Sequence, residues 1–205
     1  MFVPGEGGHV PRLIDHDERR EAFAEATWRV ILRDGVGKVS VRTVAAEAGH
    51  SAGSLRHVFA SHSELLVFAL QLVVDRAGER VDELREVPDP LERVQAVAAQ
   101  LLPLDAQRRA EMEVYLALFT AANADADLRP ARDAAHHSVL AGCRWMIEQL
   151  DTGGLLAGDA DRELEARRLH AVIDGLAAHL IYEPADADPE WARQVLVRHL
   201  RALGG

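Results

Sequence analysis

Apolar residues recur along this chain at spacings of three and four, the spacing of one face of an α-helix. No alternating run of the kind found in β-strands extends beyond a few residues. The pattern therefore predicts an all-α protein of about nine helices. The predicted helices span 16–33, 41–48, 52–59, 62–84, 90–102, 106–123, 128–151, 161–182 and 189–203.

Local signals place the ends of these helices. A Ser or Asp three residues before a carboxylate can satisfy the free N–H groups of a helix start. Such pairs are Asp15 with Glu18, Ser61 with Glu64 and Asp89 with Glu92. Pro90 and Pro189 each follow an aspartate and are expected at the first helical position, where proline's missing N–H is not needed. Helix ends are expected at Gly35, Gly49 and the pair 153–154.

Two short helices in the first third of the chain are predicted to cross steeply. Their apolar stripes consist of Val41, Val44, Ala45 and Ala48, followed by Leu55, Val58 and Phe59. Ala45 supplies the small residue needed at the crossing, and Gly49 can adopt the positive φ that ends the first helix. Ser51 can cap the second helix. The pattern is that of a helix-turn-helix, in which the second helix enters the DNA major groove.

The composition is that of a globular protein. The chain has 205 residues, of which 48% are apolar and 27% are charged. Its single cysteine, Cys143, excludes an internal disulfide and a Cys-rich zinc module, and it suits a reducing compartment. The longest apolar stretch, 65–74, is interrupted by Gln71 and is far shorter than the ~20 residues of a membrane span. We therefore expect a cytoplasmic protein with no membrane partner.

Charge is distributed unevenly along the chain. The net charge of −10 argues against nucleic acid as a partner, because phosphates repel an acidic surface. Between Arg12 and Leu66, however, eight basic residues balance eight acidic ones, whereas 15 basic residues face 24 acidic ones from Val67 onward. Any contact with an anion is thus expected in the N-terminal quarter.

Three stretches of this quarter, VRTVAAEAG (41–49), SAGSLRHVF (51–59) and SHSELL (61–66), resemble the tetracycline-repressor (TetR) family of bacterial transcriptional regulators. The stretches 114–137 and 170–184 resemble the regulatory domain of the branch that includes the repressor of the choline-to-betaine pathway. The resemblance implies a homodimer that binds a double-stranded DNA operator and a small-molecule effector of unknown identity. Together with the predicted helices, it gives four expected parts: a flexible tail (1–11), a helix-turn-helix domain (12–61), a connecting helix (62–85) and a regulatory, dimerising domain (86–205).

The motif suggests which residues meet DNA. Exposed residues of the second helix would reach base edges, and residues around the start of the first helix would meet phosphates. The sequence departs from the family at Arg56 and Val58, which replace usual aromatics, and at His62, which replaces a lysine that contacts phosphate. The predicted DNA-binding residues are Ser40, Arg42, Thr43, Ser51, Ala52, Gly53, Ser54, Arg56, His57 and His62.

Two clusters in the C-terminal part each allow two interpretations. Residues of the sixth and seventh helices either line an effector cavity, as the resemblance implies, or fill the core: Met112, Tyr115, Leu116, Phe119, Trp145 and Met146. Broad apolar faces of the last two helices either form a two-fold interface or complete the chain's own core: Val172, Ile173, Leu176, Leu180, Trp191, Val195, Leu196 and Leu200. Gly175 would allow close approach of two backbones at such an interface.

Catalytic and metal chemistry find little support. His136, His137, Asp133 and Cys143 share one predicted helix, but adjacent histidines point about 100° apart and no tight metal-binding pattern occurs. No carboxylate pair, nucleophile with base or phosphate loop stands out. We therefore expect no catalytic residues, no metal and no cofactor. The predicted function is a ligand-responsive repressor; the alternative is a helical small-molecule-binding protein without operator recognition, and an enzyme comes third.

Overall fold

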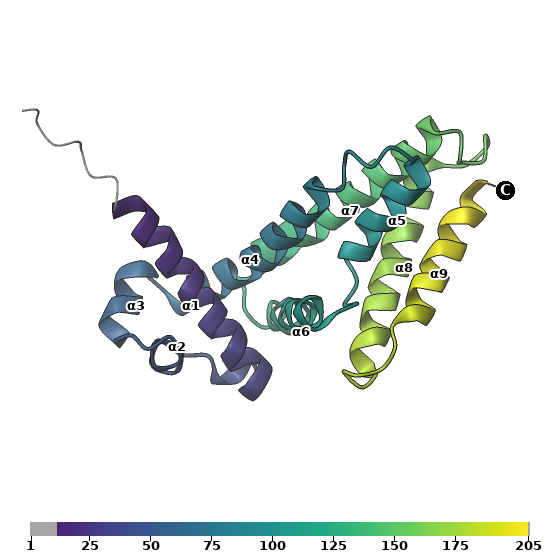
Figure 1. Ribbon diagram of the computed structural model, residues 1–205. Helices are drawn as coiled ribbons and strands as arrows, with labels where there is room; N and C mark the ends of the chain where they lie inside the picture. The colour runs from purple at the N-terminus through teal and green to yellow at the C-terminus, as the bar shows by residue number, and fades with distance from the viewer. Residues whose placement is uncertain (1–11, 205) are drawn as a thin grey trace, which may run out of the picture. The chain divides into compact units, whose positions relative to one another are not determined.

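The computed structural model describes residues 12–204, with side chains from residue 16 onward, so the predicted tail at 1–11 lies outside the described residues. Within this range all regular structure is helical, which confirms the all-α prediction (Figure 1). The chain divides into two compact units between Ala69 and Leu70, inside helix α4 (His62–Asp82).

Unit 1, up to Ala69, contains three helices before α4. They are α1 (Arg12–Asp34), α2 (Val41–Glu47) and α3 (Ala52–Val58), with a 3-10 turn, η1 (Val36–Lys38), between α1 and α2. The core side chains include Phe23, Ala26, Val30, Ile31, Val39, Val44, Ala45, Leu55, Phe59, Leu65 and Leu66. The indole Nε1 of Trp28 donates to the Ala69 carbonyl at 2.9 Å and so fastens α1 to α4.

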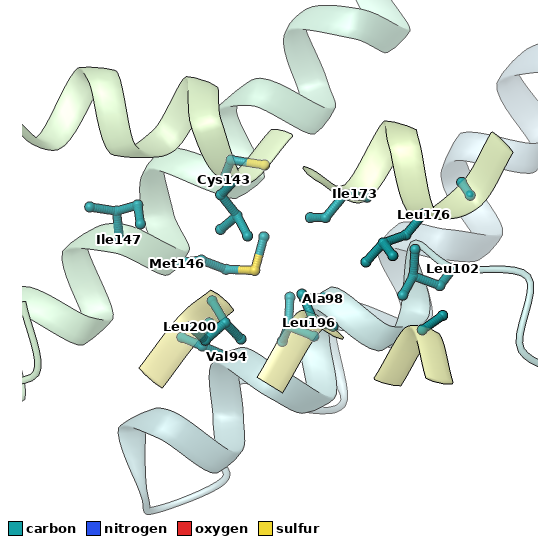
Figure 2. Packing of buried hydrophobic residues seen from close by; sticks show 14 of the residues in the cluster. Val94, Ala98, Leu102, Cys143, Met146, Ile147, Ile173, Leu176, Leu196 and Leu200 are labelled. Carbon is teal, nitrogen blue, oxygen red and sulfur yellow. The ribbon is translucent and has the colours of Figure 1, made fainter. Parts of the chain in front are cut away.

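Unit 2, from Leu70, contains the remainder of α4 and five further helices. These are α5 (Pro90–Gln100), α6 (Ala106–Ala121), α7 (Arg129–Thr152), α8 (Arg162–Tyr182) and α9 (Glu190–Arg201), followed by a 3-10 turn, η2 (Ala202–Gly204). Helix α7 packs along α8. Figure 2 shows the core, in which Cys143, Met146 and Ile147 of α7 lie among apolar side chains of α5, α8 and α9.

Most predicted helix ends agree with the structure to within two residues, because the predicted capping residues make the expected hydrogen bonds or adopt the expected backbone angles. Asp89 accepts from the Glu92 N–H at 2.8 Å, and Gly49 and Gly154 have φ of +69° and +70°. One predicted start was wrong. Helix α1 begins at Arg12, so Asp15 lies inside the helix and not just before its first residue. Pro189 is also one position off, since it is the N-cap of α9 and not its first residue.

The apolar faces of α8 and α9 mainly serve the chain itself. Ile173, Leu176, Leu180, Leu196 and Leu200 are each at most 6% exposed and belong to the core of unit 2. This corrects the expectation that these five side chains form a dimer interface, because core packing already removes them from contact with a partner. Val172 and Trp191 are half-buried against the same core, and only Val195 is exposed.

Within residues 12–204, no single helix has both the length and the apolar composition needed to cross a bilayer. Helices α3 and α4 meet the length and composition criteria only when they are taken together, and the pair is bent by 71° at its break.

Candidate DNA-binding helices and ligand cavity

The turn between α2 and α3 is built as the sequence predicts. Ala45 is only 2% exposed, and its carbonyl accepts from the His50 N–H at 2.8 Å. Gly49 supplies the left-handed residue that ends α2, with φ of +69°. The hydroxyl of Ser51 accepts from the Ser54 N–H at 3.1 Å and caps α3. These contacts fix the crossing of the two helices.

The start of α2 is closed by a reciprocal cap. The Ser40 hydroxyl accepts from the Thr43 N–H at 3.1 Å, and the Thr43 hydroxyl accepts from the Ser40 N–H at 2.9 Å. The same Thr43 hydroxyl donates to the Lys38 carbonyl at 2.8 Å. The hydroxyls of Ser40, Thr43 and Ser51 therefore already hold the motif together, and these predicted DNA contacts act first as caps.

Helix α3 presents a mixed surface. Leu55 and Val58 are buried, whereas Gly53, Arg56 and His57 are exposed. Ala52 and Ser54 are half-buried beside them. The predicted set of base-contacting side chains thus lies together on the accessible side of one helix.

Several of the basic residues of unit 1 are occupied by internal contacts. Arg29 and Arg33 of α1 bind Glu47 of α2 at 3.0 and 2.8 Å, and their hydrogen bonds lower the pKa of the Glu47 carboxyl. The guanidinium of Arg20 lies over the rings of Phe59 and Phe68 at 4.7 and 4.6 Å. Arg56, together with Lys38 and Arg42 near the start of α2, remains exposed and available to phosphates or bases.

Unit 2 contains a cavity of about 730 Å³. Its wall is built from α4, α5, α6, α7 and α8. All six residues proposed from the sequence line it: Met112, Tyr115, Leu116, Phe119, Trp145 and Met146. The rings of Tyr115 and Phe119 lie 5.1 Å apart at their centroids. A volume of this size is typical of sites for drug-sized ligands.

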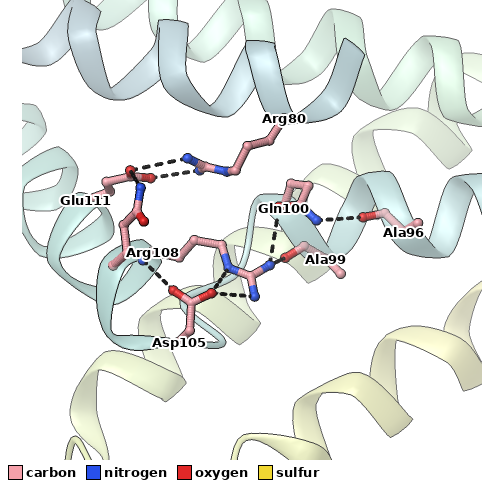
Figure 3. Close-up of polar contacts among 8 residues, drawn as sticks. Arg80, Ala96, Ala99, Gln100, Asp105, Arg108 and Glu111 are labelled. Atoms are coloured by element: carbon pink, nitrogen blue, oxygen red, sulfur yellow. Dashed lines mark hydrogen bonds and ion pairs between the residues drawn. The ribbon is translucent and has the colours of Figure 1, made fainter. Parts of the chain in front are cut away.

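A partly buried ion pair forms one part of the wall, and sequence reasoning missed it. Arg80 donates from Nη1 and Nη2 to the two carboxylate oxygens of Glu111, at 3.2 and 2.7 Å, and Gln107 adds a third hydrogen bond (Figure 3). The Glu111 side chain is 5% exposed. A signal existed, since Glu111 lies three and seven residues before the buried Val114 and Leu118 and so shares their apolar face.

Arg108, also part of the cavity wall, holds α5 against α6. It binds Asp105 at 2.8 Å and donates to the Ala99 carbonyl at 2.9 Å (Figure 3). Burial acts to raise the pKa of Asp105, but hydrogen bonds from the Arg108 N–H and guanidinium outweigh it and keep that pKa below its ordinary value. The contact keeps the short connection between the two helices in place.

A second missed group is the histidine pair of α7 and α8. The rings of His136 and His170 lie 4.9 Å apart, and His170 Nε2 lies 3.4 Å from the Asp174 carboxylate. Burial lowers the pKa of His170. Burial, with a smaller effect of the Asp174 charge, raises the pKa of Cys143 to about 12, so its thiol is protonated and unreactive at neutral pH. Within the described part of the chain, no three His, Cys, Asp or Glu side chains are grouped as metal ligands.

Comparison with known proteins decides the family. A model described as BetI-type transcriptional repressor, C-terminal, matches residues 90–205. The transcriptional regulator PksA of Bacillus subtilis is 38% identical over 196 residues, which cover 95% of this chain and 94% of PksA. The chain is a member of the TetR family.

Other transcriptional regulators are similar over most of the chain, by sequence or by fold. The nicotine-responsive transcriptional repressor HdnoR of Paenarthrobacter nicotinovorans is 26% identical over 176 residues, covering 82% of this chain and 87% of HdnoR. A transcriptional regulator from Rhodococcus sp. Rha1 matches with a TM-score of 0.78 at 31% identity, covering 90% of this chain and 95% of that one. A regulator from Saccharomonospora viridis, solved in complex with choline, matches with a TM-score of 0.76 at 28% identity, covering 88% and 94%. This TetR-family chain is therefore a transcriptional regulator.

Proposed function

We propose that this chain is a repressor that leaves its operator when a small molecule enters the cavity of unit 2. The observation that carries the proposal is the path of α4. Its first residues belong to the helix-turn-helix unit, and its later residues, from Val73 to Asp82, line the 730 Å³ cavity. One continuous helix therefore belongs to both the helix-turn-helix unit and the cavity wall. Relatives support a ligand response, since one is named for nicotine and another was solved with choline.

On the DNA side, α3 would lie in the major groove with Arg56, His57 and Ser54 toward base edges. Arg42 and Lys38, exposed beside the start of α2, would meet phosphates. Because the rest of the chain is strongly acidic, this local positive charge would orient the protein on DNA. A regulator of this kind works where the chromosome is, so we expect it in the bacterial cytoplasm.

On the ligand side, the cavity offers mostly apolar side chains with a few polar groups, the usual make-up of a small-molecule site. Tyr115, Phe119 and Trp145 provide aromatic surface, and the pairs Arg80–Glu111 and His170–Asp174 provide polar groups. A ligand that prefers the conformation of the dimer that cannot bind the operator would shift the population away from operator-bound protein.

The regulator is proposed to act as a homodimer, because two recognition helices must reach successive major grooves about 34–36 Å apart. The face of α8 that points away from the chain's own core is the best surface for it. Exposed Leu164 and Tyr182 lie toward its two ends, at 61% and 81% exposure, and the small Ala171 and Gly175 lie between them. A Cβ added at Gly175 would meet no atom of the same chain within 4 Å, which leaves room for a partner backbone.

The test begins with in vitro selection of bound duplexes from a random DNA library, followed by affinity measurement on the enriched duplex. Small molecules are then screened by thermal shift, since a ligand at 100 times its Kd stabilises by about 2.7 kcal/mol. Hits are expected to release the protein from the selected duplex. Ligand binding without any enriched duplex would favour the alternative, a small-molecule-binding protein without operator recognition. An enriched duplex that no stabilising ligand releases would overturn the proposed ligand response.

A further inference from the structure

The segment ahead of α2 has every backbone carbonyl from Lys38 to Ser40 hydrogen-bonded. The Lys38 carbonyl accepts from the Thr43 hydroxyl at 2.8 Å, and the Ser40 carbonyl accepts from the Val44 N–H at 2.9 Å. Between them, the Val39 carbonyl lies 3.1 Å from Nε2 of His62. The first two contacts come from α2 itself, whereas the third comes from the first residue of α4.

The chemistry of this third contact fixes the tautomer of the neutral imidazole. A carbonyl oxygen can only accept, so Nε2 of His62 must carry the hydrogen. In the neutral ring the other nitrogen, Nδ1, then has no proton and cannot donate to a phosphate. Both the neutral and the protonated ring can keep the bond to Val39, since Nε2–H is present in both.

Val39 is a suitable anchor. Its side chain is 6% exposed, so it is held in the core of unit 1 while its carbonyl is held by His62. It directly precedes Ser40, the N-cap of α2, and α2 sets the crossing with α3. A contact that fixes Val39 therefore fixes the place from which the helix-turn-helix begins.

We propose that His62 is a positioning residue for operator recognition, which acts by tying the start of α4 to the Val39 carbonyl and not by binding phosphate. The inference rests on the proposed function, because it concerns how the same motif reads DNA. Groups that bind phosphate contribute to affinity on every duplex, whereas a positioning contact matters most where base contacts need exact register.

The experiment compares two variants that differ only in reach. His62→Gln places an amide nitrogen near the position of Nε2, and His62→Asn places one near that of Nδ1. Affinity of full-length protein is measured at several salt concentrations, on the selected duplex and on a scrambled duplex. We expect His62→Asn to bind the selected duplex about 3- to 10-fold more weakly, as loss of one neutral hydrogen bond implies, and the scrambled duplex nearly as well as wild type does. His62→Gln should bind both duplexes within about twofold of wild type.

The salt dependence separates positioning from phosphate binding. A lost phosphate contact lowers the slope of log K against log salt by about 0.9 and weakens both duplexes alike. That result for both variants, or an unchanged affinity of His62→Asn, would overturn the proposal.

A measurement without DNA keeps the inference separate from the proposed function. Amide hydrogen exchange in peptides covering 38–46 is expected to speed up in His62→Asn and to stay close to wild type in His62→Gln. If selection enriches no duplex, the proposed function fails, but the exchange result still decides whether the hydrogen bond from His62 to Val39 holds the segment. Equal exchange in wild type and both variants would show that the tie does not hold the segment.

Discussion

Arg80 of α4 and Glu111 of α6 form a bidentate ion pair in the wall of the cavity, with nitrogen-to-oxygen distances of 3.2 and 2.7 Å. The carboxylate is 5% exposed and the guanidinium 25%. Replacing both partners of such a pair by apolar groups changes the stability little. Removing only one partner leaves the charge of the other uncompensated and destabilises the protein. The pair therefore makes the wall sensitive to single substitutions.

Glu111→Ala is expected to lower the free energy of unfolding by about 2–3 kcal/mol, somewhat less than for a fully buried pair because Arg80 is partly exposed. The double variant Arg80→Met with Glu111→Leu should lose less than Glu111→Ala alone. Urea denaturation of both variants and the wild type measures this. A Glu111→Ala protein as stable as wild type would show that the pair is solvated in solution.

Gly142 lies in the cavity wall within α7, and a Cβ added there meets no atom within 4 Å. Gly142→Leu should therefore project into open space, fill part of the cavity and raise the free energy of unfolding by about 0.5–1 kcal/mol, because leucine favours a helix interior. Affinity for the selected duplex should stay unchanged, while release by ligands is lost. Gly142→Ala is the control, since it gains the helix propensity and leaves most of the cavity open. Ligand release as in wild type would contradict the assignment of this cavity.

Stability is expected to fall in mild acid because of the buried His170 and the half-buried His199. Burial lowers the pKa of His170, and it also lowers that of His199, where nearby Arg168 adds to the effect. The unfolded chain then binds these protons at higher pH than the folded chain. The stabilising contribution is complete above the ordinary pKa of about 6.5 and is lost as pH falls toward the lowered values, by at most about 1.4 kcal/mol per pH unit per histidine.

His170→Gln should make the fall in unfolding free energy between pH 7 and 5 shallower, even if the variant is less stable at pH 7. The exposed His179 offers a matched control on the same helix. Denaturant unfolding at five pH values compares the slopes. A His170→Gln slope equal to that of wild type and of His179→Gln would assign the pH dependence to other groups.

Gly175→Leu tests the proposed dimer surface on α8. Because the position is open within a single chain, the variant should fold normally and yet clash with a partner backbone. We expect analytical ultracentrifugation to show a monomer where wild type is a dimer, with operator affinity lost in parallel. A wild-type monomer at micromolar concentration, or a dimeric Gly175→Leu protein that binds normally, would rule out this surface.

Arg56→Ala should weaken binding to the selected duplex by about 1–3 kcal/mol if its guanidinium reads a guanine, because Arg56 is exposed on α3. If Arg56 instead holds a phosphate, selected and scrambled duplexes weaken equally. Fluorescence anisotropy on both duplexes tells the two roles apart. Unchanged affinity on both would remove Arg56 from the interface.

The sequence alone determined the helices and the motif, since both depend on local rules. Apolar spacing gave the helix order to within a few residues, and Gly49, Ala45 and Ser51 specified the turn through φ, size and capping. These features depend on residues near one another in the chain. The start of α1 was the exception, because the helix already includes Asp15, which was predicted to precede it.

Only the tertiary structure decided what each apolar face contacts. The stripe of Ile173, Leu176 and Leu180 has the same pattern whether it covers the chain's own core or a partner, and the fold buries it in the core. Likewise, the bond from His62 to Val39 spans 23 residues, and the pair of Arg80 with Glu111 spans 31. Contacts at such separations follow no periodic signal, because they arise from how whole helices pack. The cavity itself is the space that five packed helices leave open, so its existence could not be predicted from the spacing of residues in any one of them.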